Sequence, residues 1–252
     1  MEALAEVMSN PFASLSKASA PSELRVGGLV PFTATDYPNA LAAVVFCQGC
    51  PWRCDYCHNP HLIPSQGEQA LDWPAIGEWL ETRRGLLDAV VFSGGEPTAQ
   101  AALSEAVTAT RAQGFRIGLH TGGVYPRRLQ ALLPQLDWIG LDLKASPAGY
   151  ARVTGVEGSE LGAFEALTLI QRAGVSFEVR TTVHGALTPP EELRALAVIL
   201  KERGVTHWVL QPFRARGCDN EALLARAYEA HILDDTLLKT LRESVPYIEV
   251  RR

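Results

Sequence analysis

Several features that mark other classes of protein are missing from this chain of 252 residues. No apolar run approaches the roughly 20 residues that a helix needs to cross a bilayer, and the N-terminus lacks the charged-then-apolar pattern of a secretion signal. No long basic run accompanies the net charge of −5, which argues against a dedicated nucleic-acid binder. We therefore expect a cytoplasmic protein that acts on neither membranes nor nucleic acids.

Internal repeats, low-complexity blocks and a linker rich in Pro, Gly or Ser are also absent beyond residue 28. With 47% apolar and 20% charged residues, the chain has the composition of a globular protein and the length to bury a full core. We expect residues 1–27, which are rich in Ser and Ala, to form a flexible N-terminal lead-in. Residues 28–252 are then expected to form a single domain.

Short apolar runs alternate with amphipathic stretches along this domain. Near-continuous apolar runs are typical of strands buried on both faces of a parallel sheet, and the amphipathic stretches are bounded by Pro, Asp and Gly as helices are. The alternation predicts a parallel α/β fold of six βα units, with a helical tail after Asn220 and a last strand at Tyr247–Val250. The predicted strands are Leu41–Phe46, Ala89–Phe92, Arg116–His120, Trp138–Leu143, Ser176–Val183 and Trp208–Pro212. The predicted helices are Trp73–Thr82, Thr98–Gln113, Tyr125–Leu133, Phe164–Ala173 and Pro189–Arg203.

Four of the five cysteines fall in one short window, Cys47–Cys57, whereas Cys218 stands far away. A cysteine cluster in a cytosolic chain indicates metal binding or redox catalysis. Zinc sites usually pair two knuckles that are a dozen or more residues apart, whereas three residues separate Cys50 from Cys54. An iron–sulfur cluster is therefore favoured over structural zinc. Cys47 is either a further ligand or a small buried side chain, and its alternation with Ala43 and Val45 favours burial. Cys218 is interpreted as an inert thiol, with a redox or hydrogen-donating role as the alternative.

A second motif, Gly94-Gly95-Glu96-Pro97, follows the second predicted strand, at the end where parallel α/β folds hold their active sites. Together with the spacing Cys50-x3-Cys54-x2-Cys57, it resembles the signature of the radical S-adenosylmethionine superfamily. The resemblance implies a partial (β/α)6 barrel in which Cys50, Cys54 and Cys57 hold a [4Fe–4S] cluster with one open iron. It also implies that S-adenosylmethionine binds this iron and is cleaved to methionine and a 5′-deoxyadenosyl radical.

Longer stretches are similar to the glycyl-radical-enzyme activating proteins, in particular to the branch that activates anaerobic ribonucleoside-triphosphate reductase. These stretches include Asp36-Tyr-Pro, Cys57-His-Asn-Pro, Arg83–Asp88, Leu141-Asp-Leu-Lys144, Arg180-Thr-Thr-Val and Gln211-Pro-Phe-Arg214. The similarity implies removal of a hydrogen atom from a glycine Cα of a partner glycyl radical enzyme. Because the chain has no inserted ferredoxin-like domain with eight more cysteines, an external flavodoxin or ferredoxin would supply the electrons. Two alternatives are a small-molecule enzyme on the same short barrel, such as a 7-carboxy-7-deazaguanine synthase-like protein, and a non-enzymatic zinc module, against which the glycine motif argues.

The same similarity implies roles for further residues. Tyr56, His58 and Arg214 would lie near the cofactor, Gly94–Pro97 at its methionine amino group, and Asp142 and Lys144 near its ribose and carboxylate. Arg180 could bind a carboxylate with its guanidinium fork. Structural alternatives remain for several of them: a rim ion pair for Asp142 and Lys144, a salt bridge for Arg180 and a loop hydrogen bond for His58. His120 stands where relatives often carry the Asp of a cation site, so we expect no such site; it is either a contact in the pocket mouth or a packed histidine.

Overall fold

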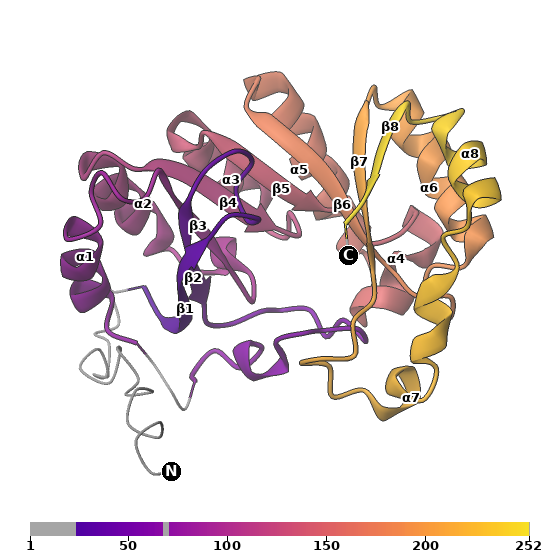
Figure 1. Cartoon of the computed structure of the whole chain (residues 1–252), viewed down its shortest axis with the longest axis horizontal. Coiled ribbons are helices and arrows are strands. Elements are labelled where there is room, and N and C mark those ends of the chain that lie inside the picture. The colour runs from indigo at the N-terminus through magenta and orange to yellow at the C-terminus, as the bar shows by residue number, and fades with distance from the viewer. Residues whose placement is uncertain (1–23, 68–70, 252) are drawn as a thin grey trace, which may run out of the picture.

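The computed structural model describes residues 24–67 and 71–251. They form one sheet of eight strands in chain order, and helices lie along its outer side from α1 at one end to α6 and α8 at the other (Figure 1). The strands are β1 (Val26–Thr33), β2 (Ala42–Cys47), β3 (Ala89–Gly94), β4 (Arg116–Thr121), β5 (Trp138–Asp142), β6 (Ser176–Val183), β7 (His207–Pro212) and β8 (Tyr247–Val250). The helices are α1 (Trp73–Glu81), α2 (Leu103–Ala112), α3 (Pro126–Leu132), α4 (Pro147–Thr154), α5 (Ser159–Ala173), α6 (Pro190–Glu202), α7 (Glu221–Leu224) and α8 (Asp235–Arg242).

Strands β2 to β8 are parallel, and β1 pairs antiparallel with β2. β1 and β8 are the two edges of the sheet and do not pair with each other, so the barrel is partial, as predicted. All six predicted strands are present, and the predicted last strand pairs with β7. None of the helices within the described ranges is long and apolar enough to cross a bilayer.

Two elements escape the sequence-based prediction. β1 has the sequence VGGLVPFT, whose glycines and proline indicate a turn rather than a strand. It forms at an edge, where proline is tolerated, and register shifts interrupt its pairing with β2. The helix α4 is short and contains Gly149, although Pro147 at its start and Gly155 in the left-handed conformation at its end are ordinary boundary signals.

The helix predicted at Thr98–Gln113 is wrong in its first turn. A short 3-10 turn, η3 (Pro97–Ala99), comes first, and α2 begins only at Leu103. Between them Gln100 is extended, because its side-chain amide donates to the carbonyls of Arg25 and Gln48 at 2.8 and 3.0 Å. These bonds hold the chain out of the helix at this point.

The structure also locates the end of the expected lead-in. Leu24 is buried and β1 begins at Val26, so residues 24–27 pack with the folded part of the chain. The remainder of the lead-in lies outside the described residues. That residues 28–252 act as a single domain stays our prediction.

Side chains alternate between the two faces of the sheet and fill two cores. One lies between the sheet and the helices and includes Val45, Cys47 and Phe92. The other lies inside the barrel and includes Tyr37, Val44 and Trp138. Above this inner core, at the carboxyl ends of the strands, the barrel interior becomes polar.

Candidate functional site

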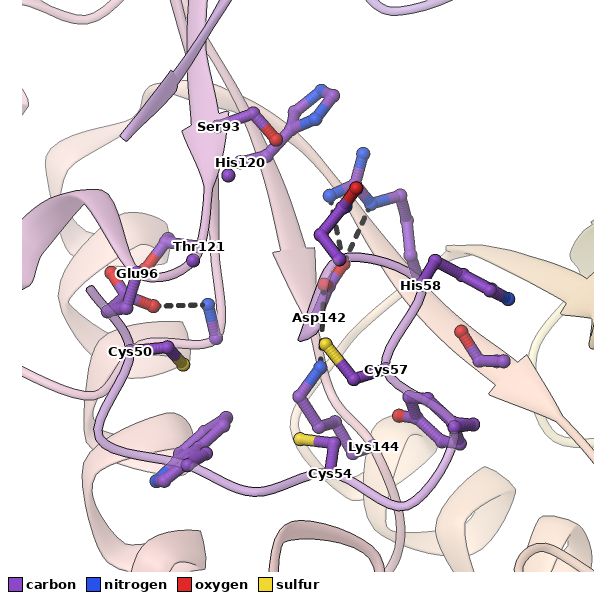
Figure 2. Close-up of a pocket in the computed structure, with 18 of the residues that line it drawn as sticks. Cys50, Cys54, Cys57, His58, Ser93, Glu96, His120, Thr121, Asp142 and Lys144 are labelled. Carbon is purple, nitrogen blue, oxygen red and sulfur yellow. Dashed lines mark hydrogen bonds and ion pairs between the residues drawn. The ribbon is translucent and has the colours of Figure 1, made fainter. Parts of the chain in front are cut away.

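A pocket opens at the carboxyl ends of the parallel strands, where the loops after β2, β3, β4, β5 and β7 meet (Figure 2). The structure brings together twelve of the thirteen residues predicted for the site. Pro97 is the exception, because it is buried behind the loop and begins η3. The predicted residues that line the pocket are Cys50, Cys54, Tyr56, Cys57, His58, Gly94, Gly95, Glu96, Asp142, Lys144, Arg180 and Arg214.

The three thiols of the CxxxCxxC motif come from a single loop after β2. Cys50 lies on one side of the pocket, and Cys54 and Cys57 lie on the other (Figure 2). The loop is fixed to the end of α4, since Arg53 N and Asp55 N donate to the carbonyls of Thr154 and Val153 at 2.9 and 3.1 Å. Burial raises the pKa of Cys50 to about 12 and that of Cys54 to about 11, and it also raises the pKa of Cys57. A metal that draws off the thiol protons would therefore be needed to form thiolates at neutral pH.

The other two cysteines differ from these three. Cys47 is fully buried in the core between the sheet and the helices, and burial raises the pKa of its thiol far above the ordinary value. Of the two alternatives for Cys47, a further ligand or a small buried side chain, its burial agrees with the second, which the strand alternation favoured. Cys218 lies beside the cysteine loop, where its thiol donates to the carbonyl of Asp55 at 3.6 Å.

The glycine motif brings the loop after β3 against the cysteine loop. Gly94 has a φ of +115°, and a Cβ there would collide with the backbone of Cys47. A Cβ on Gly95 would lie 2.5 Å from the carbonyl oxygen of Gly49. The two loops are also joined by backbone hydrogen bonds of 2.9 Å from Gly95 N to Cys47 O and from Glu96 N to Gly49 O. Both positions therefore need glycine for the packing of loop on loop, whatever ligand the loops bind.

Glu96 connects this loop to the one after β4. Its side chain is 2% exposed and accepts four hydrogen bonds, two from the backbone N–H groups of Thr98 and Gly122 and two from the hydroxyls of Thr98 and Thr121. Burial raises the pKa of Glu96, and these donors partly offset the shift. Its carboxylate is thus used within the protein, which makes it a brace between two pocket loops.

Charged side chains line the end of β5 and the facing part of β6. Arg180 Nε and Nη2 each lie 2.9 Å from Asp142 Oδ1, and Lys144 Nζ lies 3.6 Å from Asp142 Oδ2. Burial alone would raise the pKa of Asp142, but Arg180 and Lys144 outweigh it and the pKa is lowered. The expected carboxylate partner of Arg180 is therefore Asp142, as in the salt-bridge alternative.

Two histidines near the pocket are held by backbone carbonyls. His58 Nε2 lies 3.0 Å from Arg214 O, and its ring stacks on Phe213, so it makes the loop contact that the structural alternative described. His120 Nε2 lies 3.0 Å from Asp36 O and its ring packs edge-on against Trp138, yet it also lines the pocket. Burial, and then the charge of Arg180, lower the pKa of His120 to about 3.

Sequence reasoning did not single out Trp52 or Thr121. Trp52 lies within the cysteine loop, and its buried ring lines the pocket beside Lys144. An aromatic residue between two predicted metal ligands was the available signal for it. Thr121 was visible only as part of the stretch after β4, because its bond to Glu96 joins residues far apart in the sequence.

Known proteins share this architecture and sequence pattern. Residues 44–197 match the Radical SAM superfamily. A Methanocaldococcus jannaschii protein assigned to the glycyl-radical enzyme activating enzymes is 26% identical over 216 residues, which cover 78% of this chain and 82% of the relative. The pyruvate formate-lyase-activating enzyme of Clostridium pasteurianum is 29% identical over 197 residues, which cover 75% of this chain and 82% of the relative. A PqqA peptide cyclase of Gluconobacter oxydans is 33% identical over 141 residues, or 54% of this chain and 39% of the relative.

Solved structures share the fold at low sequence identity. SuiB of Streptococcus suis, in complex with its precursor peptide SuiA, superposes with a TM-score of 0.61 at 14% identity, covering 83% of this chain. The chain spans about half of SuiB, 48% of its length. A radical SAM methyltransferase of Sphaerobacter thermophilus superposes with a TM-score of 0.60 at 17% identity, covering 85% of this chain and 67% of that one. The chain belongs to the radical SAM superfamily, whose members use a [4Fe–4S] cluster and S-adenosylmethionine, and it is a radical SAM enzyme.

Proposed function

We propose that this enzyme activates a glycyl radical enzyme by taking one hydrogen atom from a glycine Cα of that partner. We infer that the partner is an anaerobic ribonucleotide reductase, from the similarity of the longer sequence stretches. The observation that carries the proposal is that three thiols of one loop and the glycine loop after β3 line a single pocket. It is supported by two relatives that are named or assigned as activating enzymes and that match about three quarters of the chain.

The donors in the pocket fit an iron–sulfur cluster. Thiolates are soft ligands suited to iron–sulfur chemistry. Within residues 24–67 and 71–251, no three His, Cys, Asp or Glu side chains gather closely enough to hold one ion, as structural zinc would require. A cubane cluster distributes its thiolates over different irons, so its ligands do not have to meet at one point. We infer that Cys50, Cys54 and Cys57 hold the cluster and leave one iron open, because Cys47 faces the other side of the sheet.

When it is bound and reduced by one electron, the cluster supplies the electron that splits S-adenosylmethionine into methionine and a 5′-deoxyadenosyl radical. The chain's own groups would orient the cofactor for this cleavage. We assign the methionine amino group to the backbone of Gly94 and Gly95, and the carboxylate and ribose to Lys144 and Asp142. Arg180 would act by holding Asp142, because its guanidinium already bonds to that carboxylate.

We infer that a protein substrate enters from the open side of the barrel. The edge strands β1 and β8 are not joined, so a partner's loop could reach the pocket between them. Relatives named as a peptide cyclase and as a peptide-bound enzyme support a polypeptide substrate. The relatives named as activating enzymes do not favour the small-molecule alternative. We propose an external flavodoxin or ferredoxin as the electron donor. We also propose the cytoplasm as the compartment, because thiols that ligate iron have to stay reduced.

The proposal is tested in two stages under strict exclusion of oxygen. The purified chain is loaded with iron and sulfide and reduced with dithionite in the presence of S-adenosylmethionine, and 5′-deoxyadenosine is quantified. The loaded enzyme is then mixed with an anaerobic ribonucleotide reductase, and the glycyl radical is detected by electron paramagnetic resonance. If 5′-deoxyadenosine forms but no radical appears on the reductase, or on another glycyl radical enzyme tested in the same way, the cleavage activity stands and the proposed activating function is refuted.

Cysteine variants provide the matched controls. Replacing Cys50, Cys54 or Cys57 by Ala should abolish iron loading and 5′-deoxyadenosine formation. The variant Cys47→Ala should keep both, because its thiol lies in the core on the helix side of the sheet. Loss of iron in Cys47→Ala with an intact fold would contradict the proposed ligand set.

A further inference from the structure

The ammonium group of Lys144 is held by two aromatic rings of the cysteine loop. Lys144 Nζ lies 5.7 Å from the ring centroid of Trp52 and 5.6 Å from that of Tyr56, within the roughly 6 Å range of cation–π attraction. Both rings are buried, and both lie between Cys50 and Cys57 in the sequence. The loop that carries the proposed iron ligands therefore also fixes the position of this charge.

Lys144 stays charged although its side chain is only 12% exposed. The Asp142 carboxylate lies 3.6 Å from Nζ, and a carboxylate this close favours the charged form of a lysine. Asp142 does not cancel this charge, because its carboxylate is shared with Arg180. Arg180, Asp142 and Lys144 together carry one net positive charge, which the burial of Lys144 shields from salt.

This charge lies on one side of the pocket. In the view of Figure 2 the side chains of Cys54 and Cys57 lie on the same side of the pocket as Lys144, whereas Cys50 lies on the opposite side with Glu96. The Glu96 carboxylate is occupied by its four hydrogen bonds. Two of the three proposed ligands thus lie on the side of the pocket that carries the fixed cation.

A fixed cation has a defined effect on an iron–sulfur cluster. Reduction moves one electron from the external donor onto the oxidised cluster and adds one negative charge, which the irons and their thiolates share. A neighbouring cation stabilises the reduced form more than the oxidised one, and charge near the cluster is one of the factors that set its potential. We propose that Lys144, held in place by Trp52 and Tyr56, raises the reduction potential of the cluster as a positioning charge. The inference rests on the proposed function, and the effect does not require bound S-adenosylmethionine, so it is separable from any contact of Lys144 with that cofactor.

The test compares cluster potentials in the absence of S-adenosylmethionine. The wild-type chain and the variants Lys144→Met, Lys144→Arg and Lys201→Met are loaded anaerobically, and iron and sulfide are counted. The reduced cluster is then followed by electron paramagnetic resonance during a redox titration. Lys144→Met should lower the ratio of reduced to oxidised cluster at least tenfold at any given potential, a shift of 59 mV for one electron. Lys144→Arg keeps the charge and should stay within about threefold of wild type. Lys201, which lies on α6 and contacts the carbonyl of Glu243, should have no effect when replaced.

The possible failures are distinguishable. A wild-type chain that binds no cluster would refute the proposed function itself. A fully loaded Lys144→Met variant with the wild-type potential would refute the inference and leave the proposed function intact. If neither Lys144→Met nor Lys144→Gln can be loaded, the lysine is needed to assemble the cluster, and the inference is again refuted.

Discussion

Glu96 lies at the junction of two pocket loops, and its replacement by Gln tests whether it braces them. In the native chain Oε1 accepts from Thr98 N and from the hydroxyls of Thr98 and Thr121, and Oε2 accepts from Gly122 N at 2.9 Å. A glutamine amide can place its oxygen at the first position and keep three of these bonds. Its NH2 group then faces the N–H of Gly122, and two donors oppose each other in a buried site.

The expected loss in free energy of unfolding follows from this single pair of opposed donors. A buried donor left without a partner costs about 1–3 kcal/mol. The three retained bonds lose their charge assistance, which is offset by removal of a buried charge. We therefore expect Glu96→Gln to lower the free energy of unfolding by about 2–3 kcal/mol. For a chain of this size that corresponds to a fall in Tm of roughly 4–12 °C.

Calorimetry of the metal-free protein measures its stability. Equilibrium binding of S-adenosylmethionine to the cluster-loaded protein measures the affinity of the pocket for this cofactor. A brace predicts that both properties fall together. Thr121→Val, which removes one donor and keeps the shape, should cost about 1 kcal/mol. An unchanged Tm combined with weaker cofactor binding would refute this reasoning, because Glu96 would then act directly on the ligand.

Three further outcomes are expected. Burial holds the pKa of His120 at about 3 in the folded chain against 6.5 ordinarily, so the unfolded chain binds more protons between these values and stability falls as pH falls through that window. The free energy of unfolding, measured with urea from pH 4 to 6, should therefore rise less steeply with pH in His120→Gln, by up to about 1.4 kcal/mol per pH unit. An unchanged pH dependence would contradict the lowered pKa of His120. Gly94→Ala should cost clearly more stability than Gly114→Ala and should also reduce iron loading, because both glycines have positive φ but only the Cβ at residue 94 meets backbone; equal costs would exclude the loop collision. Arg251→Ala should destabilise the chain by about 2–3 kcal/mol in urea unfolding, because it leaves the 3% exposed Glu178 without its two-pronged partner, whereas a change below 1 kcal/mol would show that water replaces the arginine.

Much of the fold could be read from local pattern. The parallel strands are apolar runs because both faces of the sheet are covered, and this leaves a strong signal in the sequence. β1 gave no such signal, because its two glycines and Pro31 are tolerated only at an edge next to β2. The prediction of the second helix was wrong in its first turn for a related reason. Contacts of Gln100 with residues far away in the sequence hold the chain extended at this residue.

The sequence by itself determined most of the predicted residues that meet at the pocket. Strand ends of a parallel sheet converge, so cysteines, glycines and charged residues placed after successive strands have to gather at one edge. The spacing within one loop also identified Cys50, Cys54 and Cys57 as a group, and strand alternation separated Cys47 from them.

Only the tertiary structure decided how these residues are used. The bonds of Glu96 to Thr121, of Arg180 to Asp142, and the contact of Lys144 with Trp52 join segments that are far apart along the chain. Their existence depends on the register and curvature of neighbouring strands and on side-chain orientation, and no local sequence pattern encodes these. Composition and periodicity therefore specify most of the chemical groups that reach the pocket, whereas packing decides which of them already bond to other groups of the protein and which are free for a ligand.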